Sequence, residues 1–266
     1  MYTEPLSSAK PGLIVIMVDQ SGSMADPYGE TNKANFAALA VNRVIGEIIQ
    51  ACSVGDGVKD RCFVAVIGYS SQAEVLFLEK VSELANNQNT MTLKKKISDG
   101  AGGIIEVPEI LRVFVKPTAE GGTNMTKAFE NAHIGASKFI DKNPDSFPPI
   151  IINITDGEPN SFINASIAAK KLLQLQSSDG NVILLNAHIA STLAGKIELP
   201  SNNEGFRENK FAQFLFENSS ILPDMLAQRA KEVGFNAQPN ARGFAFNADA
   251  ETLVNILNFG SLGALR

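Results

Sequence analysis

The sequence predicts a doubly wound α/β fold, in which a mostly parallel sheet carries helices on both of its faces. Apolar runs typical of buried strands alternate with segments of helical periodicity along most of the chain. The 266 residues, 44% of them hydrophobic, are enough to build one large core. We therefore expect a single domain over residues 1–266, with a core of about 12–259.

The first elements of this fold are expected between residues 12 and 78. Residues 12–19 form a nearly continuous apolar run that ends in a carboxylate, as in a strand buried on both faces of a parallel sheet. After a polar loop, apolar residues recur at helical spacing over about 33–52 and predict a long amphipathic helix. Strands are expected at 63–68 and 73–78, with a tight serine-rich turn between them.

The same alternation continues in the second half of the chain. Its expected elements are a helix at about 124–140, a strand at 150–155, a helix at about 162–176, a strand at 182–189, a short strand at 243–246 and a last helix at about 249–259. This alternation of strands and helices predicts one mostly parallel sheet, and the sequence contains no repeat of fixed period.

Two long segments, about 84–120 and 191–223, do not fit the regular alternation of strands and helices and are interpreted as insertions. The first is expected to include a hairpin at about 92–107, over the edge or top of the sheet. The lysine run at 94–96 is interpreted as a solvated face of this hairpin rather than a site for an acidic partner. A short packed helix is predicted in the second insertion from Phe211, Phe214, Leu215 and Phe216.

Charge and motif content exclude several classes of partner. The net charge is −5 and no dense basic stripe is present, so we expect no nucleic acid partner. No apolar stretch is long enough to span a membrane, and the polar first residues do not resemble a secretory signal, so the expected location is cytoplasmic. No phosphate-binding glycine motif is present, which argues against a nucleotide cofactor.

The cysteines and histidines are interpreted as structural. Cys52 and Cys62 flank a short polar loop, so a disulfide is conceivable, but we expect two buried, reduced thiols because a chain of this size needs no covalent staple. His133 is expected to be a partly exposed residue beside the apolar stripe of the helix at about 124–140. His188 ends a strand beside the one that precedes Asp156 and could face a ligand, but a satisfied core or boundary histidine is the preferred interpretation.

Oxygen-bearing side chains follow two of the expected strands and precede one helix. Asp19, Ser21 and Ser23 lie in the loop directly after the first strand, and Asp156 directly follows the strand at 150–155. Thr123 follows two glycines and leads into a helix. If the two strands are neighbours, their carboxyl ends bring these side chains together. The alternative is that the carboxylates cap helices and the hydroxyls close turns.

These five side chains offer hydroxyl and carboxylate oxygens, without histidine or cysteine. Such a donor set selects a hard cation, Mg²⁺ or alternatively Mn²⁺ or Ca²⁺, over zinc. An ion held mainly by neutral hydroxyls keeps much of its positive charge and an open coordination position, which a carboxylate from a partner protein can fill. The residues around the site, at 24–31 and 158–161 and in the two insertions, are expected to select that partner.

The pattern Asp-x-Ser-x-Ser with a distant Thr and a distant Asp resembles the metal-ion-dependent adhesion site of the von Willebrand factor A (VWA) family. The resemblance extends from about residue 12 to residue 259 and departs at the two insertions. It implies that Ser21, Ser23 and Thr123 ligate the ion directly, Thr123 in the ligand-bound form. It also implies that Asp19 and Asp156 act mainly through water and orient the other ligands.

The resemblance implies a metal-dependent protein-binding module that is not an enzyme. Loop texture over 119–125 is most similar to bacterial cytoplasmic TerY-like members, which implies kinase or phosphatase signalling partners in stress responses. Two alternatives come from other classes: a metal-dependent hydrolase or phosphatase using the same oxygen ligands, and an extracellular adhesin. The sequence offers the hydrolase no general base apart from the aspartates and His188.

Overall fold

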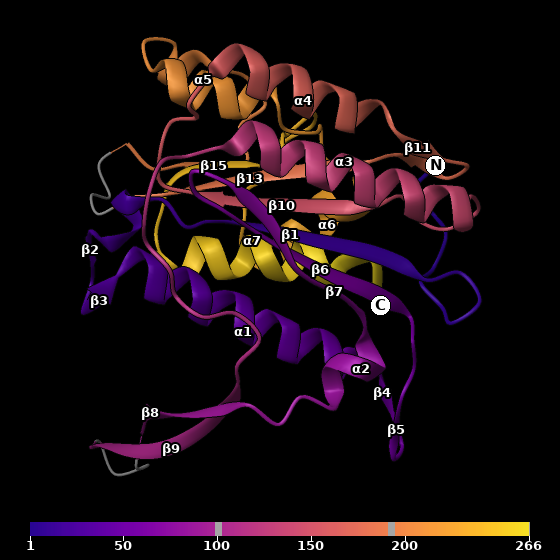
Figure 1. The fold of residues 1–266 in the computed structure, drawn as a ribbon, viewed down its shortest axis with the longest axis vertical. Coiled ribbons are helices and arrows are strands. Elements are labelled where there is room, and N and C mark those ends of the chain that lie inside the picture. Colours follow the sequence, from indigo (N-terminus) through magenta and orange to yellow (C-terminus); the bar gives the residue numbers. More distant parts are fainter. Residues whose placement is uncertain (99–102, 191–194, 266) are drawn as a thin grey trace.

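The computed structural model describes residues 1–98, 103–190 and 195–265 and is built around one seven-stranded sheet (Figure 1). Its strands are β1 (Gly12–Asp19), β6 (Cys62–Tyr69), β7 (Ala73–Lys80), β10 (Ile150–Thr155), β13 (Ile183–Ile189), β14 (Ile197–Glu198) and β15 (Phe244–Ala248). Their order across the sheet is β14-β15-β13-β10-β1-β6-β7. Only the edge strands β7 and β14 run antiparallel to their neighbours within this sheet, so the expected mostly parallel α/β fold is confirmed.

Helices cover both faces of the sheet (Figure 1). One face is covered by α1 (Lys33–Cys52), α6 (Asp224–Glu232) and α7 (Ala250–Leu262), and the other by α3 (Met125–Lys142), α4 (Phe162–Gln174) and α5 (Lys210–Glu217). The short helix α2 (Val81–Ala85) follows β7. The expected elements therefore exist with boundaries shifted by a few residues at most, whereas α2, α6 and β14 were not anticipated.

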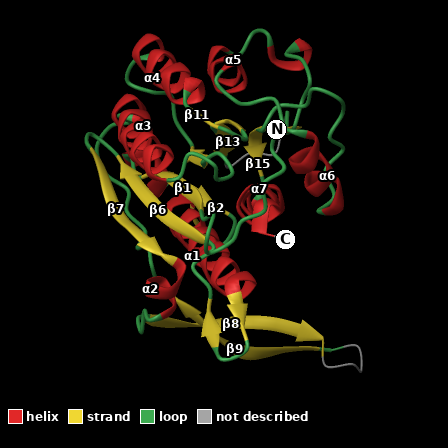
Figure 2. Ribbon diagram, turned by 90° about the vertical axis from the view of Figure 1, so that its right-hand side faces the viewer, coloured by secondary structure: helices red, strands yellow, loops and turns green. Residues whose placement is uncertain are grey.

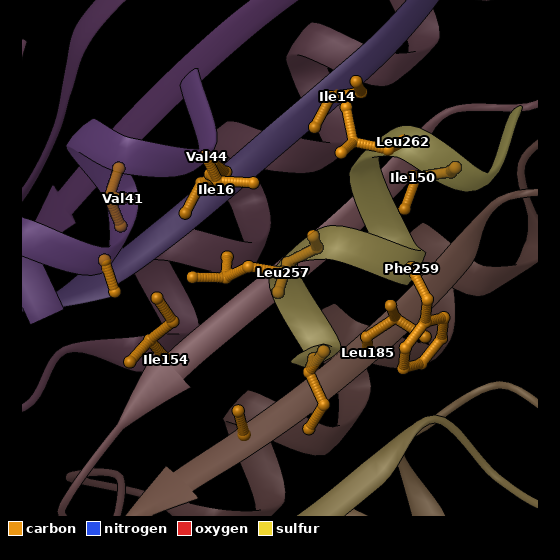
Figure 3. Close-up of a cluster of buried hydrophobic side chains, with 14 of the residues drawn as sticks. Ile14, Ile16, Val41, Val44, Ile150, Ile154, Leu185, Leu257, Phe259 and Leu262 are labelled. Atoms are coloured by element: carbon orange, nitrogen blue, oxygen red, sulfur yellow. The ribbon is translucent and has the colours of Figure 1, made fainter. Parts of the chain in front are cut away.

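The central strands are apolar on both sides because each side faces a layer of helices. In β1, Ile14 and Ile16 belong to the core beneath α1 and α7, whereas Leu13 and Val15 belong to the core beneath α3 and α4. Figure 3 shows the first of these cores, where side chains from β1, α1 and α7 meet. Burying each large aliphatic side chain contributes about 1.5–3 kcal/mol, which makes these two layers the main source of stability.

Several helices begin at a side chain that accepts a hydrogen bond from a backbone N–H of the first turn, as expected for an N-cap. These caps are Asn32 of α1, Asn124 of α3, Ser161 of α4, Asn209 of α5 and Asp249 of α7. Because several of these helices start at the carboxyl edge of the sheet, the caps also fix the loops that surround the candidate site.

The first insertion forms the expected hairpin, with β8 (Thr90–Ser98) and β9 (Ile104–Arg112) as a separate two-stranded sheet. It does not lie over the edge or top of the large sheet, as the sequence had suggested, but stands beyond α1 (Figure 2). Arg43 of α1 pairs with Glu109 at 2.6 Å, and the side chain of Asn42 accepts from the backbone N–H groups of Phe114 and Val115. Polar contacts with α1 therefore help to hold the hairpin in this position, together with the packing of Phe114 and Val115 against the core. Residues 99–102 lie outside the described residues.

The second insertion contains the expected short helix as α5, preceded by a 3-10 turn, η2 (Glu204–Phe206), and followed by α6. Asn186, in the middle of β13, is fully buried and holds this region to the sheet. Its amide donates to the backbone oxygens of Leu215 and Asn218 and to the hydroxyl of Ser219. Residues 191–194 lie outside the described residues.

Short two-residue strands form three further ribbons, and two more 3-10 turns complete the described chain. They are β2 (Pro27–Tyr28) with β3 (Thr31–Asn32), β4 (Ser53–Val54) with β5 (Gly57–Val58), β11 (Gln176–Ser177) with β12 (Gly180–Asn181), η1 (Gly22–Ala25) and η3 (Gly263–Leu265). Cys52 and Cys62 are both buried, as expected, and carry free thiols in the structure. Among the described residues, no helix is long and apolar enough to cross a membrane.

Candidate functional site

The candidate site lies where β1 and β10 end. The two strands are parallel neighbours, with Val18 of β1 in register with Ile154 of β10. Asp19 and Asp156 therefore lie close together at the same edge of the sheet. The two strands are neighbours, as this arrangement of the site requires.

Asp19 is 1% exposed, and hydrogen bonds fix both of its carboxylate oxygens. Oδ1 accepts from the backbone N–H of Ser21 at 2.9 Å, and Oδ2 accepts from the hydroxyl of Thr155 at 2.8 Å. Burial raises the pKa of Asp19 to about 6, although hydrogen bonds from Ser21 and Thr155 oppose the shift. The carboxylate is thus held rigidly in a setting where a nearby positive charge would favour its ionised form.

Ser21 and Ser23 connect Asp19 to Asp156. The Oγ atoms of Ser21 and Ser23 lie 3.2 Å apart, and the Ser23 hydroxyl donates to Oδ1 of Asp156 at 2.8 Å. The loop after β1 therefore links two serines and two carboxylates in one hydrogen-bonded chain, which begins at the backbone N–H of Ser21.

Thr123 reaches the same place from the start of α3. A Cβ atom built on Gly157 would lie 3.6 Å from Oγ1 of Thr123 and also 3.6 Å from Oγ of Ser23. The two hydroxyl oxygens thus face the same side of Gly157, where the missing side chain leaves room beside them. All five residues singled out from the sequence are close together in the structure.

The loop that carries Thr123 is held by backbone contacts to neighbouring loops. The N–H of Gly22 donates to the carbonyl of Gly121 at 3.0 Å, and the N–H of Gly122 donates to the Ser71 hydroxyl at 3.0 Å. Gly121 has φ +72°, and an added Cβ would lie 2.5 Å from that hydroxyl, so glycine is needed there. Asn160 accepts from the Thr123 N–H at 3.1 Å.

Lys33, the first residue of α1, is a part of the site that the sequence analysis missed. Its Nζ lies 2.8 Å from Oδ2 of Asp156 and 3.2 Å from Oδ2 of Asp26. Burial lowers the pKa of Lys33, but the hydrogen bonds and charges of the two aspartates outweigh this effect and leave the pKa raised. The only sequence signal was its position at a helix start near the site, which is common for exposed lysines as well.

His188 is a satisfied core histidine, as preferred from the sequence. Its ring stacks on Phe246 at 4.2 Å between centroids, and Nδ1 accepts from the backbone N–H of Asn247. The backbone of Asp156 is a further hydrogen-bond partner, and burial lowers the pKa of His188 to about 4. His133 is half-buried on α3, in agreement with the expected partial exposure.

The donor set fits a hard divalent cation. Ser21, Ser23 and Thr123 would hold such an ion, with Asp19 and Asp156 orienting the hydroxyls and supplying negative charge. Among the described residues, no cluster of three or more histidine, cysteine or acidic side chains could form an alternative metal site. The absence of a side chain at Gly157 is consistent with this arrangement, because the position of its missing Cβ borders two of the candidate hydroxyls.

No protein-family model and no curated protein matches the sequence. Among solved structures, the chain is similar to the pilus adhesin SpaC from Lactobacillus rhamnosus GG, with 15% identity over 98% of this chain and 31% of that chain, at a TM-score of 0.56. It is also similar to a von Willebrand factor type A structure from Catenulispora acidiphila, with 17% identity over 78% of this chain and 37% of that chain, at a TM-score of 0.42. A third is the manganese-loaded TRAP protein of Plasmodium vivax, with 18% identity over 95% and 74% of the two chains, at a TM-score of 0.45.

These likenesses concern the fold. The chain spans 37% of the length of the Catenulispora structure and 31% of the length of SpaC. The strand order, the helices on both faces and the likeness to SpaC over 98% of the chain agree with one another. The chain therefore adopts a mostly parallel α/β fold that resembles the fold of SpaC.

Proposed function

We propose that this chain is a metal-dependent protein-binding module and not an enzyme. The observation that carries the proposal is the hydrogen-bonded chain from Asp19 through Ser21 and Ser23 to Asp156, beside the Thr123 hydroxyl. Mg²⁺ is the preferred ion because every candidate ligand is an oxygen, and Mn²⁺ or Ca²⁺ would suit the same donors.

Each residue of the site has a separate role in holding the ion. Asp19 holds the Ser21 backbone, Asp156 orients the Ser23 hydroxyl, and Asn160 fixes the backbone of Thr123. A divalent cation bound mainly through neutral hydroxyls would supply a positive centre with a free coordination position for an oxygen ligand. We infer that an Asp or Glu carboxylate of a partner protein takes that position.

A hydrolase that uses the same donors is the weaker hypothesis. General base catalysis needs a group that can reach a bound water and accept its proton. His188 is buried and stacked on Phe246, and it has hydrogen-bond partners in the backbones of Asn247 and Asp156, so it offers no free nitrogen to a bound water. The binding module requires no such base.

The proposed setting is a cytoplasmic signalling scaffold in a bacterium, similar to TerY-like proteins and with kinase or phosphatase partners. An extracellular adhesin is the competing setting. Fractionation of the native cells, followed by detection of the chain with a specific antibody, decides between them: recovery with the cytosolic fraction supports the scaffold, and recovery at the cell surface supports the adhesin.

A pull-down from native lysate tests the function itself. The tagged chain is expected to retain a partner in Mg²⁺ and to lose it in EDTA, and Thr123→Ala is expected to lose it in both. Thr3→Ala is the matched control, because Thr3 is exposed and its side chain bonds only weakly, at 3.4 Å, to Asp179. Retention of the same partner by the metal-depleted chain would contradict the proposal.

A further inference from the structure

A buried lysine lies against the candidate cation site. The side chain of Lys33 is 8% exposed and that of Asp156 is 0% exposed, and their charged atoms lie 2.8 Å apart. The second partner of Lys33, Asp26, has a side chain that is 59% exposed. The ammonium group therefore lies between a buried carboxylate of the site and a carboxylate at the protein surface.

We propose that Lys33 is a built-in competitor of the divalent cation and sets how tightly the site binds it, an inference that rests on the proposed function. The proposal assigns Lys33 a regulatory electrostatic role. It does not make Lys33 a ligand of the ion.

The hydrogen bonds of Asp156 are the first support for this role. Oδ1 accepts from the Ser23 hydroxyl at 2.8 Å, and Oδ2 accepts from Lys33 at 2.8 Å. Both oxygens of the carboxylate are thus engaged, one of them by a full positive charge. A divalent cation must either share Asp156 with this ammonium group or displace it.

The charge balance of the site is the second support. Two carboxylates, Asp19 and Asp156, would together present two negative charges to an ion. The buried ammonium group of Lys33 offsets part of this charge, because its second carboxylate partner, Asp26, is 59% exposed and screened by solvent. Because the pair is buried, solvent screens the repulsion between the ammonium group and a second cation only weakly. Lys33 therefore lowers the affinity of the site for any cation.

The attachment of Lys33 to the loop at 26–32 is the third support. Its backbone N–H donates to the carbonyl of Asp26 at 3.1 Å, and its side chain bonds to the carboxylate of the same residue. Asp26 thus offers the ammonium group a second, more exposed partner when a cation occupies the site. The same loop lies within the rim that is proposed to meet the partner, so ion binding and rim geometry are linked through one side chain.

The test is a titration of the full chain with Mn²⁺, in which electron paramagnetic resonance measures the concentration of the free ion. Lys33→Met removes the charge but keeps much of the volume, and is expected to bind Mn²⁺ at least about tenfold more tightly than wild type. Lys33→Arg keeps the charge and is expected to bind like wild type. Lys10→Met is the matched control. Lys10 also pairs with a carboxylate, Glu4 at 2.7 Å, but it precedes the N-terminal end of β1, whereas the site lies at the C-terminal end.

Thermal unfolding gives a second readout that does not depend on a partner. Removing Lys33 leaves Asp156 buried without its counter-charge, so metal-free Lys33→Met is expected to unfold at a lower temperature than wild type. Saturating Mn²⁺ is expected to raise its unfolding temperature more than that of wild type. Lys33→Gln, which keeps a hydrogen-bond donor for Asp156, serves if the methionine variant does not fold, and the same tighter binding is expected.

The outcomes separate this inference from the proposed function. If wild type binds Mn²⁺ and the uncharged variants bind it equally or more weakly, Lys33 does not compete and the inference is overturned. If the uncharged variants bind Mn²⁺ and wild type does not, the inference is supported. If no variant binds Mn²⁺ saturably, the proposed function fails and the inference fails with it.

Discussion

Thr155, the last residue of β10, donates its hydroxyl to Oδ2 of Asp19, the last residue of β1, at 2.8 Å. The bond joins the ends of two adjacent parallel strands and fixes a carboxylate that is 1% exposed. The other oxygen of Asp19 holds the Ser21 backbone. Thr155 is therefore a positioning residue: it acts on the site through Asp19.

Replacing Thr155 with Val keeps the shape of the side chain and removes the donor to Asp19. The change is expected to reduce the free energy of unfolding by about 1–3 kcal/mol, because a buried carboxylate oxygen loses its hydrogen bond. Urea denaturation measures this loss, and Thr155→Ser, which keeps the hydroxyl, is expected to retain most of the stability. Equal stability of the valine variant and wild type would show that Asp19 does not depend on this bond.

Gly157 provides a test of the space beside the hydroxyls. An added Cβ would make ordinary contacts, at 3.6 Å, with Oγ of Ser23 and Oγ1 of Thr123. Gly157→Ala is thus expected to fold with stability within about 0.5 kcal/mol of wild type, but to bind Mn²⁺ more weakly because the methyl group fills the space beside two candidate ligands. The measurements are calorimetric titration and thermal unfolding.

Gly46→Ala is the control for Gly157→Ala. Gly46 lies within α1, and an added Cβ would meet nothing within 4 Å. The alanine is expected to stabilise the helix by up to about 1 kcal/mol and to leave Mn²⁺ binding unchanged. If both glycine variants bind Mn²⁺ like wild type, the ion does not use the space beside Gly157.

Asn186 is expected to be essential for anchoring the second insertion. Asn186→Ala removes an amide that bonds to Leu215, Asn218 and Ser219 and accepts from Asn153, so the unfolding free energy is expected to fall by about 2–4 kcal/mol. The exposed Asn164→Ala on α4 is the control, with a change within about 0.5 kcal/mol. Hydrogen exchange of α5 is expected to accelerate only in the first variant; unchanged protection would contradict the anchoring role.

Much of the fold could be predicted from the sequence because its strands are nearly continuous apolar runs and its long helices have regular periodicity. The helix α6 was not predicted because it is short and fully buries only Leu226 and Ala230. The two-residue strand β14 depends on its pairing with β15, a long-range contact that local propensity does not encode. The predicted place of the β8–β9 hairpin was wrong because its position depends on long-range contacts with α1, including those of Asn42 and Arg43, which local patterns do not encode.

The five candidate ligands could be predicted because each lies at a strand end or helix start that converges on one sheet edge. The residues that position them could not. Thr155 was an ordinary β-branched strand residue in the sequence, and its bond to Asp19 depends on the pairing of β1 with β10. Lys33 had no apolar or motif context that distinguished it from a solvated helix start, and only the fold reveals its burial against Asp156.

The most direct test of the central claim is a Mn²⁺ titration of wild type and of the double variant Ser21→Ala/Ser23→Ala, with competition by Mg²⁺. Ser178→Ala, an exposed serine on the β11–β12 turn, is the control. We predict one saturable Mn²⁺ site per chain that Mg²⁺ displaces, unchanged in the control and lost or weakened at least about tenfold in the double variant. Binding of equal strength in the double variant, or the absence of saturable binding in wild type, would contradict the assignment of the cation site.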